Sequence, residues 1–159
     1  METSEIDLDS LTTQFENIIR AVFEPLLKAP LERVEELLPE DNQKATRSAC
    51  VHILGGWQGT VSSEIEIDLL TTITKNMLQK EQVDADELGS VSSELTNIIG
   101  GNLKGILAVD RCILSIPKEK VSQGFDFHEL ENKIIIKLCF KSGFQLMVIK
   151  LHQALTKIV

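Results

Sequence analysis

Four small or polar residues recur along one stretch of the chain at intervals of four, three and four residues: Ser90, Glu94, Asn97 and Gly101. Because a helix turns by about 100° per residue, this spacing places all four on the same side of a helix. A carboxylate pairs with a cation, whereas a carboxamide donates and accepts hydrogen bonds and does not titrate. Glu94 and Asn97 are therefore candidates for holding a charged partner and orienting a water molecule.

Helix propensity does not explain this choice of residues. Asparagine is a mediocre helix former, and each glycine of Gly100-Gly101 costs on the order of 1 kcal/mol relative to alanine. Two explanations for the glycines stay open: Gly101 lets another protein's backbone approach Glu94 and Asn97, or both glycines allow tight packing of the helix on its neighbour. A glutamate and an asparagine three residues apart are also common on solvated helix faces, so the spacing alone is weak evidence.

The helix that carries these residues is predicted from about Asp84 to Leu107. A mostly apolar stripe covers about one third of its circumference. Its members are Leu88, Val91, Leu95, Ile98, Ile99, Asn102 and Ile106. We expect this stripe to face the core, which leaves Glu94 and Asn97 on a different sector.

Two further helices are predicted before it. The first is amphipathic, starts near Asp9 or Ser10, bends at Pro25 and ends before Pro30. The second follows Asp68 as its N-cap and covers residues 69–78. Residues 30–45 have the composition of a short helical turn and a loop, and no function is assigned to them.

Extended patterns occupy the rest of the chain. A hairpin is predicted around Gly55-Gly56, and three later strands are predicted in the segments CILSIP, KIIIKLCF and FQLMVIKL. This order of elements favours an α+β fold with two layers, in which long helices pack on a mostly antiparallel sheet of about five to six strands.

Composition limits the class of protein. With 159 residues, 43% hydrophobic and 25% charged, the chain is expected to form a single domain over residues 1–159, with residues 1–6 as a disordered tail. The net charge of −8 comes without a basic patch, which disfavours nucleic acid as a partner. Lysines interrupt the apolar stretch 134–151, and the N-terminus has no basic start followed by an apolar segment, so we expect a cytoplasmic protein without a membrane span.

Other kinds of chemistry find little support. Three separated cysteines, Cys50, Cys112 and Cys139, fit buried reduced thiols better than a disulfide or zinc framework. The histidines, His52, His128 and His152, lack ligand spacing, so no metal site is expected. Neither glycine pair has the lysine and hydroxyl of a P-loop. Trp57 is either a surface contact or a plug at a strand edge, and the plug is favoured.

The motif around the helix resembles the signature of the CheC, CheX and FliY phosphatases. The resemblance rests on Ser90-x3-Glu94-x2-Asn97, the following Ile98-Ile99-Gly100-Gly101-Asn102 and the later Leu114-Ser115-Ile116-Pro117, and it spans about residues 45–150. The hairpin Gly55-Gly56-Trp57-Gln58-Gly59 and the segment Asn76-Met77-Leu78 also resemble this family. Only 19 residues separate Asn97 from Pro117, fewer than in the CheC form of the motif.

The resemblance implies a phosphatase that hydrolyses the aspartyl phosphate of a CheY-like response regulator. Glu94 would then pair with a receiver lysine, Asn97 would orient the attacking water, and Ser90 and Gly101 would line the contact. The receiver would supply the Mg²⁺, so the chain would need no cofactor of its own. Residues 69–78 have Ile73 three residues before Asn76, which leaves one acid and amide pair per chain, as in CheX.

Two further expectations follow from the same resemblance. CheX relatives are often homodimers, and the apolar C-terminal strands offer an edge on which two subunits can extend one sheet. The alternative function is a non-catalytic module that binds receivers or acts as a scaffold, because flagellar switch proteins share the fold.

Overall fold

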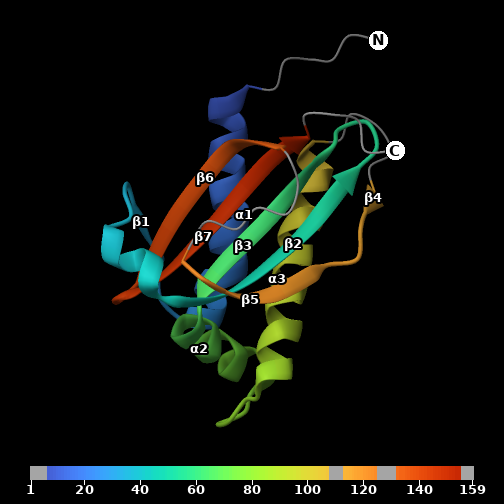
Figure 1. Cartoon of the computed structure of the whole chain (residues 1–159). Helices are drawn as coiled ribbons and strands as arrows, with labels where there is room; N and C mark the ends of the chain where they lie inside the picture. The colour runs from blue at the N-terminus through green and yellow to red at the C-terminus, as the bar shows by residue number, and fades with distance from the viewer. Residues whose placement is uncertain (1–6, 108–112, 125–131, 155–159) are drawn as a thin grey trace.

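Two layers make up the computed structural model, which describes residues 7–107, 113–124 and 132–154. One layer is an antiparallel sheet of seven strands, and the other consists of three helices on one face of it (Figure 1). The α+β prediction is confirmed. The elements are α1 (Leu8–Leu27), β1 (Glu32–Val34), the 3-10 helix η1 (Pro39–Gln43), β2 (Ala45–Leu54), β3 (Gly59–Glu66), α2 (Ile67–Leu78), α3 (Ala85–Ile106), β4 (Ile113–Leu114), β5 (Lys118–Gln123), β6 (Asn132–Ser142) and β7 (Gln145–Ala154).

The strand order β1-β6-β7-β3-β2-β4 differs from the sequence order, and β5 also pairs with β2. The predicted hairpins are both present, as β2 with β3 and β6 with β7. The C-terminal strand β7 lies between β6 and β3, so both of its edges are paired. The expectation that the C-terminal strands form an edge is therefore wrong for β7.

The helices begin where the sequence supplies caps. Asp7 accepts hydrogen bonds from the backbone N–H groups of Asp9 and Ser10 at the start of α1. Asp84 and Glu87 form a capping box at the start of α3. The predicted N-cap of α2 is wrong, because Glu66 occupies that position without a side-chain cap and Asp68 lies in the first turn.

The core fills the space between the helices and the sheet. Aromatic rings of α1 and branched residues of all three helices pack against alternate residues of β3, β6 and β7. Fully buried members include Phe15, Phe23, Leu69, Ile73, Ile99, Ile65, Phe140 and Ile149. Within the described ranges, no helix has the length and apolar character needed to cross a membrane.

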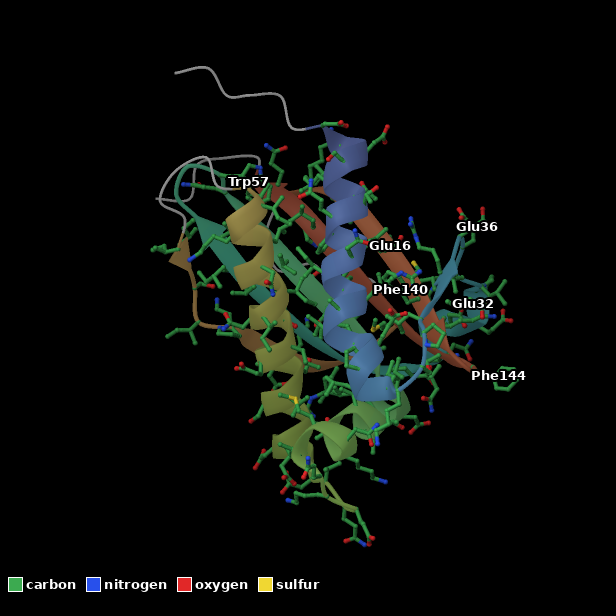
Figure 2. All side chains as sticks on the ribbon, turned by 180° about the vertical axis from the view of Figure 1, so that it is seen from behind. Glu16, Glu32, Glu36, Trp57, Phe140 and Phe144 are labelled. Carbon is green, nitrogen blue, oxygen red and sulfur yellow. The ribbon has the colours of Figure 1, made fainter. Side chains whose placement is uncertain are left out.

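A cluster of charges ties α1 to the segment that follows it. Arg20 lies between Glu16 and Glu24, at 3.1 and 3.2 Å, and donates to the Leu31 carbonyl oxygen at 2.6 Å. The Leu31 N–H donates to Glu24, and Arg33 pairs with Glu16. In Figure 2, Glu16 lies on the side of α1 that faces β1. Residues 30–45, predicted as a turn and loop, therefore include a short edge strand as well as the 3-10 turn.

Candidate active site

Helix α3 lies close to the sheet because small residues form its buried side. Ser92, Thr96 and Gly100 are all buried. The hydroxyls of Thr96 and Ser63 lie 2.6 Å apart, and Thr96 also donates to the Ser92 carbonyl. A Cβ on Gly100 would come within 2.8 Å of the Val51 Cγ1 atom. The tight-packing explanation thus accounts for Gly100.

The predicted core stripe of α3 is correct only in part. Val91, Leu95 and Ile99 are buried, but Ile98 is half-buried, and Asn102 and Ile106 are exposed. These three residues line a groove of about 710 Å³ between α3 and α1, together with residues such as Ile18 and Val22. The helix is therefore rotated relative to the prediction, because its small residues, and not only its apolar ones, face the sheet.

The groove between α3 and α1 is lined by none of the four ridge residues, Ser90, Glu94, Asn97 and Gly101. Ser90 and Glu94 are exposed, and Asn97 and Gly101 are half-buried. Residues three apart on a helix have Cβ atoms about 5–6 Å apart, so Glu94 and Asn97 are neighbours. Neither side chain forms a hydrogen bond or an ion pair with any described residue. A carboxylate and a carboxamide are thus available together to an external partner.

An edge of the sheet runs alongside this ridge. Leu114 of β4 lies against Gly100 and Gly101, with its Cδ1 atom 3.8 Å from the position of a Cβ on Gly101. At the other end, Glu119 of β5 lies within 2.7 Å of where a Cβ of Gly89 would be. The edge from β4 to β5 therefore runs along α3 (Figure 1).

A partly buried ion pair fixes the beginning of α3 to this edge. The Arg47 side chain, from β2, pairs with Glu119 at 3.1 Å and donates to the Ala85 carbonyl oxygen at 3.0 Å. Gly89 leaves the space that the two side chains occupy. The sequence prediction missed Arg47 and the whole of β5. A charged strand at a sheet edge has no apolar alternation, so no signal in the segment KEKVSQ distinguished it from a loop.

The helix beside α3 is α1, and it repeats the spacing of the ridge. Ser10, Gln14, Asn17 and Ala21 follow one another at intervals of four, three and four residues. The Gln14 amide donates to the Ser10 hydroxyl at 3.0 Å. Glutamine has no charge, so this second line has no anion to offer to a cation.

The residues of α2 that were compared with the motif have structural roles. Ile73 is fully buried, and the Asn76 amide donates to the Leu26 carbonyl oxygen at 2.6 Å.

The other polar candidates lie elsewhere in the sheet. The ring of His52 lies 2.8 Å from the Thr60 hydroxyl, and that of His152 lies 3.1 Å from the Ser62 hydroxyl. His128 and Cys112 are outside the described residues. Cys50 and Cys139 are buried thiols, and burial raises the pKa of the Cys139 thiol. In the parts of the chain that the structure describes, no three His, Cys, Asp or Glu side chains form a group that could hold a metal ion.

Trp57 is a plug, as predicted. Its side chain is 7% exposed and packs into the space left by Gly59, where a Cβ would lie 2.3 Å from the indole ring.

Comparisons with known proteins give a consistent picture. The family model described as chemotaxis phosphatase CheX matches residues 47–138, which is more than half of the chain. No sequence among the curated proteins matches.

Several solved structures share the fold. The chemotaxis protein CheX from Vibrio vulnificus is 18% identical, with a TM-score of 0.75, over 95% of this chain and 99% of that one. CheX from Borrelia burgdorferi, solved as a CheX-CheY-BeF3-Mg²⁺ complex, is 13% identical, with a TM-score of 0.72, over 94% and 99%. The FliM middle domain from H. pylori is 11% identical, with a TM-score of 0.56, over 96% and 94%.

Proposed function

Because this chain belongs to the CheX family of chemotaxis phosphatases, we propose that it hydrolyses the aspartyl phosphate of a CheY-like response regulator. The observation that carries the proposal is the pair Glu94 and Asn97, which project from one ridge of α3 without partners among the described residues. The solved complex of the Borrelia burgdorferi relative, which contains CheY, BeF3 and Mg²⁺, supports a receiver as the partner. A receiver substrate places this activity in the cytoplasm.

The chemistry requires little from the phosphatase itself. Water attacks phosphorus in line with the bond to the aspartate oxygen, that bond breaks, and inorganic phosphate and a free carboxylate result. The receiver brings the lysine, the phosphorylated aspartate and the Mg²⁺, which neutralises charge on the phosphoryl oxygens. The chain then needs to contribute only positioning: an anion for docking and a group that orients the water.

We assign these two tasks to the two residues of the ridge. The Glu94 carboxylate would pair with the receiver lysine, which fixes the two proteins in register. The Asn97 carboxamide would hydrogen-bond the attacking water, and it keeps the same charge at every pH because it does not titrate. Ser90 and Gly101 would line the contact one helical turn to either side. Neither Glu94 nor Asn97 would become covalently modified.

One site per chain follows from the comparison of the two long helices. The line on α1 has the amide Gln14 where the ridge has Glu94. Without a carboxylate, this line cannot supply the ion pair that we assign to docking.

The alternative is a module that binds a receiver without hydrolysis. The likeness to the FliM middle domain shows that the fold alone does not decide between the two functions. The carboxylate and the carboxamide favour catalysis, because a scaffold has no chemical need for both at this spacing.

The deciding experiment measures phosphate release from a phosphorylated receiver in the presence of the purified protein. We expect release to be faster than spontaneous hydrolysis, and to return to the spontaneous rate with Glu94→Ala/Asn97→Ala. Tight binding of the receiver without faster release would identify the scaffold function. Unchanged release by the double variant would refute the assignment of the site.

We also propose a homodimer joined through β6. Along the described part of β6, the strand β1 covers the outer edge only at residues 139–141. Residues 132–138 pair with no second strand among the described residues, and an unpaired strand edge can bind a strand of a second copy. Light scattering during size-exclusion chromatography tests this proposal, and a monomer at micromolar concentration would contradict it.

A further inference from the structure

A bulge interrupts the edge of the sheet beside the ridge. Strand β2 pairs with β4 at Ile53 and Leu114, and with β5 at Cys50 and Lys118. Two residues of β2 lie between these pairs, whereas three residues, 115–117, lie between them on the edge. One extra residue on one strand is a β-bulge, which redirects side chains and is common beside active sites.

The protein has a dedicated arrangement that stabilises this bulge. The Ser115 N–H donates to the His52 carbonyl oxygen at 2.9 Å, and the His52 N–H donates to the Ser115 hydroxyl at 2.9 Å. The serine side chain thus replaces a backbone acceptor of the ladder. Pro117, which follows, has no N–H to leave unsatisfied. The bulge is therefore a defined feature of the edge.

The bulge leaves Ile116 in solvent. Its exposed fraction is 85%, which is the largest of the large aliphatic side chains among the described residues. An exposed branched side chain gains free energy when a partner covers it. The position of Ile116 on the surface indicates which partner covers it.

Distances along the helix and the edge place Ile116 at about the same level along α3 as Asn97. From Gly89 to Gly100, α3 rises by about 16 Å. From Glu119 to Leu114, the edge extends by about the same length, since a strand advances by about 3.3 Å per residue. The two ends of these segments are in contact, so Ile116 lies at about the level of the helical turn that carries Asn97. A protein that docks on Asn97 would therefore come close to Ile116.

We propose that Ile116 selects the receiver, and this inference rests on the proposed function. Besides the lining residues Ser90 and Gly101, the docking surface then has the anion of Glu94, the amide of Asn97 and the apolar side chain of Ile116. It fits a receiver that has an apolar side chain at the rim of its phosphorylation pocket, next to its lysine. A receiver with a charged side chain at that place would have to desolvate it against Ile116, which costs free energy.

The experiment uses the full chain and several CheY-like receiver domains from the same genome, phosphorylated with a small-molecule phosphodonor. For the receiver that is hydrolysed best, we expect Ile116→Ser to raise KM by about tenfold and to leave kcat within about twofold, as the loss of one buried aliphatic contact requires. Ile116→Leu should restore the wild-type KM. Val121→Ser is the matched control, because Val121 is a 62% exposed aliphatic residue on β5.

The outcomes separate this inference from the function on which it rests. An unchanged KM for Ile116→Ser, or an equal rise for Val121→Ser, overturns the inference while wild-type turnover upholds the phosphatase. If the wild-type protein hydrolyses no receiver, the phosphatase fails, and binding to receivers activated with BeF3 and Mg²⁺ still tests Ile116. Weaker binding of only the Ile116→Ser variant would then support it, and equal binding of all variants would overturn it.

Discussion

Gly100 and Val51 are packed so closely that α3 has no room for a methyl group between them. A Cβ on Gly100 would lie 2.8 Å from the Val51 Cγ1 atom, and Val51 is fully buried. Asn97 of the ridge lies one helical turn before Gly100, so this contact sets how close the backbone of the ridge lies to the sheet. Glycine is used here because the backbone itself forms the interface.

We expect Gly100→Ala to destabilise the protein. Alanine would gain up to about 1 kcal/mol of helix propensity. Overpacking against Val51, a stiff β-branched neighbour, costs about 1–3 kcal/mol, so the steric cost exceeds the gain in helix propensity. Urea denaturation should show a net loss of about 1 kcal/mol in the free energy of unfolding. A gain in stability would mean that α3 can move away from Val51.

Gly101→Ala should instead raise the stability of the protein while it lowers the phosphatase activity. The new Cβ would make only ordinary contact with Leu114, at 3.8 Å, so helix propensity raises the free energy of unfolding by about 0.5–1 kcal/mol. If the backbone of a receiver comes close to Gly101, the added methyl group hinders docking, and phosphatase activity falls although the protein is more stable. Gly105→Ala is the control, because a Cβ there meets nothing within 4 Å. Equal activity of both variants would remove Gly101 from the docking surface.

Replacing Asn97 should lower the turnover number kcat. Loss of a group that orients the attacking water lowers the rate of the chemical step by about 10²-fold or more, while docking through Glu94 persists. We therefore expect Asn97→Ala to lower kcat strongly and to change the affinity for a BeF3-activated receiver by less than about threefold. The control is Asn17→Ala on α1, because Asn17 has the same place in the line Ser10, Gln14, Asn17, Ala21 as Asn97 has in the ridge. This variant should leave kcat unchanged. Stopped-flow or phosphate-release assays measure both variants.

Glu94 should act on association as well as on turnover. Glu94→Gln keeps the size of the side chain and removes the charge, so the ion pair with the receiver lysine is lost. A drop of about tenfold in kcat/KM is expected, with a weaker dependence on salt than the wild type shows. Kinetics at two ionic strengths measure this effect. An unchanged salt dependence would show that Glu94 does not meet a cation.

Local patterns in the sequence predicted the elements that position the site. Capping residues and apolar periodicity predicted α3 to within about one residue at each end, and glycine turns marked both hairpins. The ridge was predicted as well, because the spacing of its residues depends only on helix geometry. These signals all act over a few residues.

Features that depend on distant contacts could not be predicted. The rotation of α3 is set by the small residues Ser92, Thr96 and Gly100 against the sheet, and hydrophobic periodicity does not register small residues. The short strand β1 and the charged strand β5 are extended because longer strands pair with them. The place of Ile116 on a bulge follows from the registers of two separate strand pairs, which no single stretch of sequence contains.

The Arg47 ion pair should hold α3 in place. Arg47→Met removes the buried arginine of a partly buried pair with Glu119 and the hydrogen bond to the Ala85 carbonyl oxygen. Charge-assisted hydrogen bonds contribute about 1–3 kcal/mol, and we expect a loss of that size in the free energy of unfolding. Lys80→Met is a control, because the Lys80–Glu87 pair involves a half-exposed lysine on the same part of the molecule and should matter much less. Equal losses would show that the Arg47 pair is no stronger than a surface pair.

Acid should weaken the link between α1 and β1 through Glu16. Burial by itself raises the pKa of this carboxyl, but hydrogen bonds and charge from Arg20 and Arg33 outweigh it, and the net pKa lies below its ordinary value of 4.5. A carboxyl whose pKa is lower in the folded state than in the unfolded state stabilises the folded protein at pH values above the pKa of the unfolded state. This contribution to the free energy of unfolding is lost as the pH falls through the pKa of the folded state. Glu16→Gln should therefore be less stable than the wild type at neutral pH, and the difference should shrink below pH 4.5. Thermal denaturation of both proteins between neutral and acidic pH measures how their stabilities converge. A difference in stability that stays constant down to the pH of acid unfolding would contradict the ion-pair explanation.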